Sequence, residues 1–209
     1  MNNYFLSGEN ILKSYGRRLV FKDLNFSFSG SGVWGVAGPN GSGKSTLVKI
    51  IAGVISPTKG KIEHKLYDKK VESENLHKYI GFVSPYLVLY DEFSAEENLI
   101  YFTKIRGIGY NREKVDSLLN EFLLYERRND LLKGYSSGMK QRMKFIFALI
   151  HSPKLLILDE PTTNLDTSGK DSVYKIINEE SSSSIVIIAS NEQSDLASCK
   201  EIIHLEDYK

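Results

Sequence analysis

The sequence predicts an α/β fold with a mainly parallel sheet, an antiparallel β region at its N-terminal end and a helical segment inserted into the core. Three observations support this prediction. Continuous apolar segments at 155–158 and 185–189 are typical of strands buried in a parallel sheet. Helical patterns alternate with these segments, as in a sheet that helices cover on both faces. Three consecutive helical patterns between about 85 and 148 indicate an inserted helical subdomain within one domain of residues 1–209.

The first 30 residues have the pattern of a sheet. Leu24, Phe26 and Phe28 alternate with polar residues, which is the period of a half-buried strand. A short apolar strand at 33–37 leads into a glycine-rich turn, and the apolar residues after the turn follow at helical spacing as far as Ile51. The remaining strands are expected at 79–83, 155–158, 185–189 and 202–205.

Capping residues mark the helices of the middle segment. Ser94 and Glu97 form a capping box, which opens a helix that extends to about Lys104. Asn111 can cap a second helix, and a third begins at about Gly138. The apolar face of the second helix consists of Val115, Leu118, Leu119 and Phe122. That of the third consists of Met139, Met143, Ile146, Phe147 and Ile150.

Composition excludes several classes of protein. The 27 basic and 26 acidic residues give a formal net charge of +1, which argues against nucleic-acid binding through bulk positive charge. The longest apolar run, 145–150, is far shorter than the ~20 residues that cross a bilayer. A single cysteine, Cys199, excludes an internal disulfide and suits a reducing compartment. We therefore expect a cytoplasmic protein that meets a membrane only through a partner.

A phosphate-binding motif follows the strand at 33–37. It matches G-x-x-x-x-G-K-[ST] in full and consists of Gly38, Pro39, Asn40, Gly41, Ser42, Gly43, Lys44, Ser45 and Thr46. Glycines let the backbone turn tightly and direct successive N–H groups at one anion, and the helix that follows adds the positive end of its dipole. We expect Lys44 to reach the β- and γ-phosphates of a nucleotide and Ser45 to ligate Mg²⁺.

Two carboxylates follow the apolar strand at 155–158. Asp159 and Glu160 should lie at the C-terminal edge of the sheet, where open α/β sheets bind their ligands. We expect Asp159 to hold Mg²⁺ and Glu160 to polarise an attacking water as a general base. On its own this pattern is weak, because many strands end in a solvated acid. Together with the phosphate-binding motif it predicts nucleotide hydrolysis.

The order of these motifs resembles the P-loop NTPases of the ABC ATPase family. Residues 135–142 resemble the family's L-S-G-G-Q signature in a variant form, with Ser136 at the signature serine and Gly138 at the second glycine. Residues 163–166 resemble the D-loop, and Tyr15 resembles the aromatic residue that stacks on adenine. The resemblance covers essentially the whole chain. It is strongest to small ATP-binding subunits of bacterial exporters, including the haem-exporter type.

This resemblance implies an ATPase that uses ATP and Mg²⁺ and drives a separate transmembrane permease. In the family, the signature serine and glycine of one subunit complete the ATP site on the phosphate-binding loop of another. The resemblance therefore implies a homodimer, or a heterodimer with a related ATPase, at the cytoplasmic face of the plasma membrane. Two alternatives stay open: a soluble ABC ATPase without a membrane partner, and a nucleotide-binding regulatory module with very slow hydrolysis.

The sequence departs from the family pattern at two positions. The Q-loop glutamine should follow the strand at 79–83, but Ser84 and Pro85 stand there. We expect Ser84 to substitute for the glutamine by reaching Mg²⁺ through a bridging water, whereas Pro85 cannot donate a hydrogen bond. The switch histidine should follow the strand at 185–189, where Asn191 can donate a hydrogen bond but cannot carry charge. We therefore expect slow hydrolysis, with Asn191 taking the catalytic place of the histidine, and ordinary affinity for ATP.

The segment 85–90 is apolar and rich in aromatic residues. It lies where the family receives a helix of the membrane subunit, and such a composition suits a docking surface. Burial within the helical subdomain is the alternative interpretation.

Overall fold

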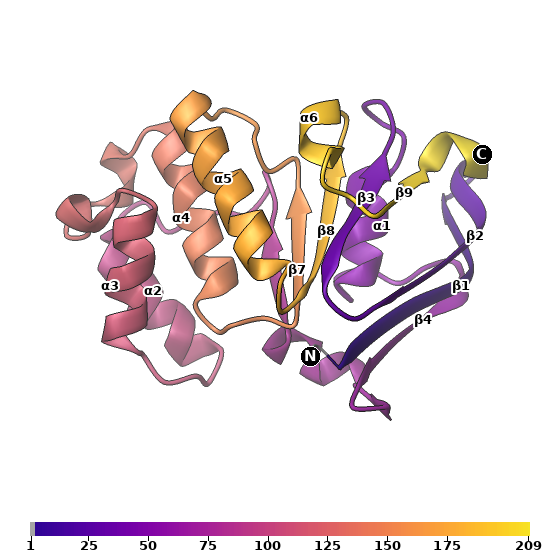
Figure 1. Ribbon diagram of the computed structural model, residues 1–209, viewed down its shortest axis with the longest axis horizontal. Helices are drawn as coiled ribbons and strands as arrows, with labels where there is room; N and C mark the ends of the chain where they lie inside the picture. The colour runs from indigo at the N-terminus through magenta and orange to yellow at the C-terminus, as the bar shows by residue number, and fades with distance from the viewer. Residues whose placement is uncertain (1–2) are drawn as a thin grey trace.

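The computed structural model describes residues 3–209 and contains two sheets with helices between and beside them (Figure 1). A four-stranded sheet has the order β2-β1-β4-β5, and a five-stranded sheet has the order β6-β7-β8-β3-β9. The helix α1 lies between the two sheets, and the helices α2 to α5 lie on the other side of the five-stranded sheet. The predicted α/β fold with its N-terminal antiparallel region is therefore confirmed.

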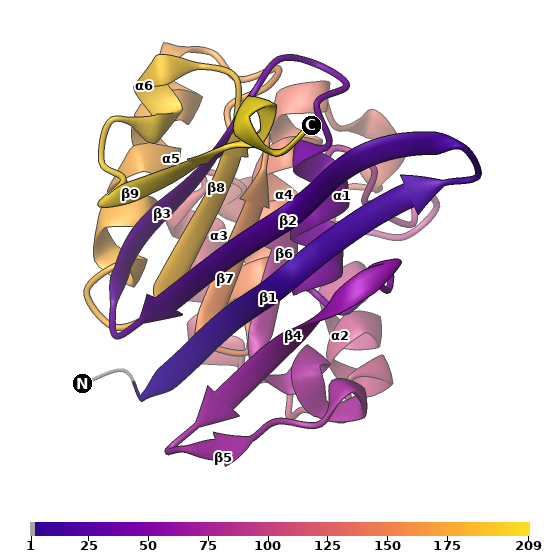
Figure 2. The same cartoon turned by 90° about the vertical axis from the view of Figure 1, so that its right-hand side faces the viewer.

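The antiparallel sheet faces the viewer in Figure 2. It consists of β1 (Tyr4–Tyr15), β2 (Arg18–Ser29), β4 (Lys59–Leu66) and β5 (Lys69–Lys70). In β2 the predicted alternation is confirmed, because Leu24, Phe26 and Phe28 are buried while the polar residues between them are exposed. The strand β4 was not predicted. Its side chains are mostly polar, and it joins the sheet by antiparallel pairing with β1.

The second sheet is parallel throughout. It consists of β3 (Gly32–Ala37), β6 (Ile80–Val83), β7 (Leu155–Asp159), β8 (Ile185–Ser190) and β9 (Glu201–His204). Every residue of β3, β7 and β8 is buried, because successive side chains enter the two hydrophobic cores on opposite faces of the sheet. The last predicted strand begins and ends one residue earlier than expected, since Leu205 begins a 3₁₀ turn.

The helices of the middle segment begin where their caps predict. They are α2 (Ala95–Ile105), α3 (Arg112–Glu121) and α4 (Ser137–Leu149). Ser94 and Glu97 form the full capping box, and the Asn111 side chain accepts a hydrogen bond from the Lys114 amide. The helix α4 packs closely on β6, since a Cβ at Gly81 would lie 2.3 Å from the carbonyl oxygen of Ala148.

The remaining elements complete the core and the connections. They are α1 (Lys44–Ile51), α5 (Thr167–Glu180), α6 (Gln193–Leu196) and the 3₁₀ turns η1 (Ser73–Lys78), η2 (Tyr125–Arg127), η3 (Leu132–Gly134) and η4 (Leu205–Tyr208). Within residues 3–209, no helix combines the length and the apolar character that a membrane span requires.

Candidate nucleotide site

The phosphate-binding motif forms a turn between β3 and the start of α1. Gly41 has φ +80° and Gly43 has φ +112°, a conformation that residues with a side chain rarely adopt. A Cβ at Gly43 would lie 2.6 Å from Cγ1 of Val20, so this position also needs the small residue for close packing. The turn leaves the N-terminus of α1 open at the C-terminal edge of the parallel sheet. Such a helix terminus attracts an anion.

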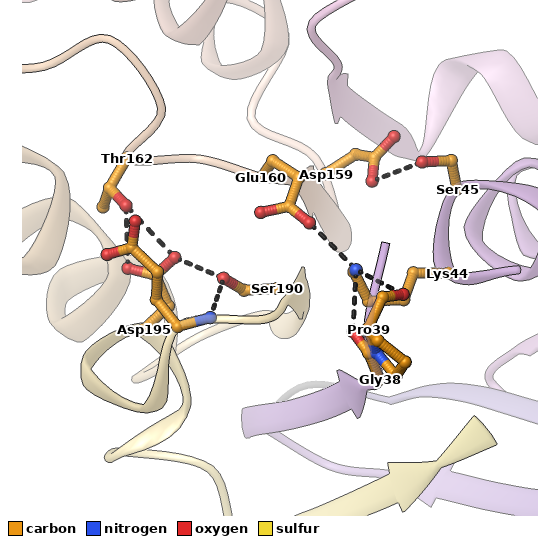
Figure 3. Close-up of polar contacts among 10 residues, drawn as sticks. Gly38, Pro39, Lys44, Ser45, Asp159, Glu160, Thr162, Ser190 and Asp195 are labelled. Atoms are coloured by element: carbon orange, nitrogen blue, oxygen red, sulfur yellow. Dashed lines mark hydrogen bonds and ion pairs between the residues drawn. The ribbon is translucent and has the colours of Figure 1, made fainter. Parts of the chain in front are cut away.

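Lys44 lies at the centre of this turn. Its Nζ donates to the carbonyl oxygens of Gly38 at 2.9 Å and Pro39 at 3.4 Å, and it lies 3.1 Å from Oε1 of Glu160 (Figure 3). The Lys44 side chain is only 5% exposed. The cation of the phosphate-binding motif and the second of the two predicted carboxylates are therefore in direct contact.

Ser45 and Asp159 form the second pair of the site. The Ser45 hydroxyl donates to Oδ1 of Asp159 at 3.0 Å, although 114 residues separate them in the sequence. Asp159 is fully buried, and its Oδ2 has no hydrogen-bond partner in the described part of the chain. Burial raises the pKa of this carboxyl group above its usual range. A hydroxyl beside a buried carboxylate with an unused oxygen is a donor set that fits Mg²⁺.

Glu160 adopts a strained backbone conformation. Its φ is +49°, which is uncommon for a residue with a side chain. Its amide donates to the carbonyl oxygen of Ala189 at 2.8 Å, so the turn after β7 is fixed against the end of β8. This turn directs the Glu160 carboxylate toward Lys44, away from Asp159 (Figure 3).

A cavity of about 750 Å³ opens in front of these groups. Its lining comprises Tyr15, Arg18, Leu19, Val20, Asn40, Gly41, Gly43, Lys44, Ser45, Thr46, Pro85, Tyr86, Glu160 and Lys209. Tyr15 is 54% exposed, which leaves its ring available for stacking. The sequence reasoning missed Arg18 and Lys209. The Lys209 ammonium donates to the carbonyl oxygens of Ser42 and Val20, a contact that depends on the folded chain.

Ser136 and Gly138 lie at the N-terminus of α4, and neither lines this cavity. The Ser136 hydroxyl accepts a hydrogen bond from the Met139 amide at 3.2 Å and thereby caps this helix. Gly138 faces the carbonyl oxygen of Asn164, which would lie 3.4 Å from a Cβ at this position. The structure therefore does not bring the signature residues to the Lys44 cavity of their own chain.

The two positions that depart from the family pattern, Ser84 and Asn191, do not line the Lys44 cavity. Ser84 is buried, its Oγ accepts from the Tyr86 amide at 3.3 Å, and it does not line the nucleotide cavity. Asn191 is exposed and lines a second cavity together with Gly38 and Pro39. The roles of Ser84 and Asn191 stay predictions.

A buried lysine that the sequence reasoning did not identify holds the loop after β6. Lys144 on α4 is 9% exposed, and its Nζ donates to the carbonyl oxygens of Ser84 at 3.1 Å and Pro85 at 2.9 Å. Burial lowers the pKa of its ammonium group. Because Pro85 lines the nucleotide cavity, this lysine connects the helical segment to the edge of the site.

Comparison with known proteins agrees with this geometry. A sequence profile of the ABC transporter family matches residues 21–163, which include the phosphate-binding turn, the signature segment and the two carboxylates. The chain belongs to the ABC transporter family. The predicted resemblance is therefore confirmed.

Two relatives and one solved structure illustrate the similarity to other ABC proteins. The linearmycin resistance ATP-binding protein LnrL of Bacillus subtilis (strain 168) is 32% identical over 185 residues, which are 88% of this chain and 60% of that protein. The lantibiotic transport ATP-binding protein SrtF of Streptococcus pyogenes is 34% identical over 200 residues, which are 96% of this chain and 83% of that protein. A putative ABC transporter ATP-binding protein from Pyrococcus furiosus has the same fold, with a TM-score of 0.83, 24% identity, and coverage of 98% of this chain and 99% of that one.

Proposed function

We propose that this chain binds ATP with Mg²⁺ and hydrolyses it as the motor subunit of an exporter. The observation that carries the proposal is the convergence of Lys44, the Ser45–Asp159 pair and Glu160 at one cavity. The cation and the open helix terminus suit phosphates, and the exposed Tyr15 ring at the same cavity suits a base. Two chemically different parts of a nucleoside triphosphate, the phosphates and the base, thus have matching groups at one cavity.

Ser45 and Asp159 are the residues that would hold Mg²⁺. The ion would neutralise charge on the terminal phosphates of ATP. Asp159 suits this role because its buried carboxylate has an unused oxygen and accepts a hydrogen bond from a neutral hydroxyl, that of Ser45. A bound cation would also favour the ionised form of this carboxyl group, whose pKa burial raises.

Glu160 is the group we assign as general base. Its carboxylate would accept a proton from water as the water oxygen attacks the γ-phosphorus, and the bond from that phosphorus to the β–γ bridging oxygen would break. Lys44 would stabilise the negative charge on the phosphate oxygens during this step. In the structure Lys44 is paired with Glu160, so phosphate binding to Lys44 would leave the carboxylate free for water.

The position of the signature residues supports a dimer that binds ATP between its two subunits. Ser136 and Gly138 lie at an exposed helix N-terminus outside the Lys44 cavity, where a second molecule could place its nucleotide. We infer that two copies, or this chain and a related ATPase, close around ATP. Hydrolysis would remove the phosphate bridge and let the two halves part.

The segment after β6 supports a membrane partner. Tyr86, Val88 and Tyr90 are 71%, 85% and 62% exposed, while Leu89 is buried. A groove of about 290 Å³ lies beside this segment and is lined by Leu87 to Leu89, α4 and the loop at 163–164. Exposed apolar side chains beside a groove suit an inserted helix. We propose that the permease docks here, at the cytoplasmic face of the membrane.

The transport function is tested by fractionating cells that carry the tagged chain, with and without the gene of its copurifying membrane protein. We expect the chain to sediment with membranes only when that protein is present. A double substitution of Tyr86 and Val88 by serine should release it, whereas serine at the exposed Tyr67, in the β4–β5 turn, should not. Sedimentation that is independent of any membrane protein would instead support a soluble ABC ATPase.

A nucleotide-binding regulatory module is the second candidate. Asn191 favours it because it cannot carry the charge of the family's histidine, and Pro85 favours it because it cannot donate the hydrogen bond of the family's glutamine. Glu160 argues against it, since its strained turn is costly and a binding module needs no base there. A comparison of phosphate release with a Glu160 variant separates the two functions.

A further inference from the structure

A buried carboxylate ties three elements together beside the nucleotide site. Asp195 on α6 is 2% exposed and accepts hydrogen bonds from three hydroxyl groups (Figure 3 shows two of them). The donors are Ser190 Oγ at 2.7 Å, Tyr174 OH at 2.9 Å and Thr162 Oγ1 at 3.0 Å. A buried carboxylate needs such partners, because an uncompensated charge is costly in the interior. The three donors come from β8, from α5 and from the loop after β7.

Two of these donors flank the groups to which we assign roles in hydrolysis. Ser190 ends β8 directly before Asn191, and its Oγ also accepts from the Glu192 amide at 3.0 Å, which fixes the turn at Asn191. Thr162 follows Glu160 by two residues. The carboxylate of Asp195 thus joins the turn that carries Glu160 to the turn that carries Asn191.

The Glu160 turn needs external support to persist. Its φ of +49° is strained, and strained residues keep their conformation only where neighbouring contacts hold them. The Gln141 side chain holds the same turn from α4, by donating to the carbonyl oxygen of Pro161 at 3.2 Å in a buried contact. The Thr162–Asp195 contact holds it from the other side.

We propose that Asp195 is a positioning residue for ATP hydrolysis, which fixes the turn of Glu160 relative to Asn191 through Thr162 and Ser190. Asp195 does not line the nucleotide cavity, so it acts on the reaction through the residues it holds. The inference rests on the proposed function in one respect, the assignment of Glu160 as the base. We call the contacts of Asp195 with Thr162 and Ser190 the clamp. Loss of the clamp should lower kcat and leave the KM for ATP unchanged, because Asp195 does not contact the nucleotide cavity.

Three matched substitutions separate positioning from general stability. Thr162→Val, Ser190→Ala and Tyr174→Phe each remove one hydroxyl donor from the same carboxylate. Only the first two donors adjoin the reaction site, whereas Tyr174 lies on α5. We expect Thr162→Val and Ser190→Ala to lower kcat by about tenfold or more at unchanged KM, and Tyr174→Phe by less than about twofold. Thr162→Ser, which keeps the hydroxyl, should retain the wild-type kcat.

Hydrogen exchange provides a readout that needs no hydrolysis. The backbone amides of Glu160, Thr162, Thr163 and 190–192 should exchange faster in Thr162→Val and Ser190→Ala than in Tyr174→Phe at equal global stability. Equal loss of kcat in all three variants, in step with their Tm, would overturn the proposal, as would unchanged exchange at both turns. Absence of ATP turnover in the wild-type protein would instead contradict the proposed function, and the exchange experiment would still test the clamp.

Discussion

The ammonium group of Lys44 lies 3.1 Å from Oε1 of Glu160, so the cation of the phosphate-binding loop and the proposed general base form an ion pair. The pair is largely shielded, with side-chain exposures of 5% for Lys44 and 21% for Glu160. A phosphate group that binds Lys44 must replace Glu160 as its anionic partner. Nucleotide binding and the release of the base are therefore linked through one lysine.

This linkage predicts that Glu160→Gln binds a non-hydrolysable ATP analogue more tightly than the wild type. The substitution removes both the competing partner of Lys44 and a negative charge near the phosphates, and we expect a gain of about tenfold. Calorimetric titration measures it. Glu192→Gln is the matched control, because Glu192 pairs with Lys170 at 3.2 Å and does not line the cavity. Unchanged or weaker binding by Glu160→Gln would contradict the linkage.

A second prediction concerns the switch position. Asn191→His should raise the turnover of ATP by about threefold or more, because an imidazole can carry positive charge next to the γ-phosphate whereas an amide cannot. Asn191→Ala should lower it, since alanine removes the hydrogen-bond donor as well. Steady-state phosphate release measures both rates. A turnover in Asn191→His that is equal to or below the wild-type value would disprove our account of this position.

The third prediction concerns the lysine that holds the loop after β6. Lys144→Met keeps the apolar stem but removes the ammonium that binds the Ser84 and Pro85 carbonyls. We expect faster amide exchange in this loop and a turnover lowered by about fivefold. Lys140→Met is the control on the same helix, because it removes only a partly exposed ion pair with Asp91, worth about 1 kcal/mol or less. Identical exchange in both variants would exclude a special role for Lys144.

The fourth prediction concerns stability at acid pH. Burial lowers the pKa of His64 from 6.5 to about 4, and this side chain lies hydrogen-bonded to Tyr4. The unfolded chain therefore takes up a proton before the folded one as the pH falls. The contribution of neutral His64 to the free energy of unfolding is fully present above pH 6.5. It is lost as the pH falls from 6.5 to 4, and the loss amounts to at most about 3 kcal/mol.

Urea unfolding across this pH range measures the effect. In His64→Gln, the free energy of unfolding should fall less steeply between pH 6.5 and 4 than in the wild type, and the remaining slope should include His151, whose pKa burial also lowers to about 4. An unchanged slope in His64→Gln would show that this histidine does not contribute to acid sensitivity.

Local sequence signals predicted the elements whose formation depends on neighbouring residues. The capping box of Ser94 and Glu97 and the Asn111 cap each mark a helix start, because the side chain bonds an amide three residues away. In contrast, β4 carries little apolar periodicity and exists through its pairing with β1. No bounds were predicted for the helix α5, although Asp166 caps it, because Asp166 was interpreted only as part of the D-loop.

The residues of the site likewise fall into those that a sequence motif marks and those that only folding brings there. Lys44, Ser45, Asp159 and Glu160 belong to motifs with fixed spacing, and the structure places them together. Asp195 has no motif that marks it, since its three partners come from different elements. Arg18, Lys144 and Lys209 likewise reach the site or its edge only in the folded chain. Long-range packing decides such contacts, and a single sequence does not encode them locally.

Phosphate release during a single turnover of bound ATP and Mg²⁺, compared between the wild type and Glu160→Gln, tests the central claim most directly. Both proteins must first be shown to bind the nucleotide. We predict a slow but measurable rate in the wild type and a decrease of about 100-fold or more in Glu160→Gln, because the variant has no carboxylate to accept the proton of water. Equal rates in the two proteins would contradict the assignment of this cavity as the site of hydrolysis.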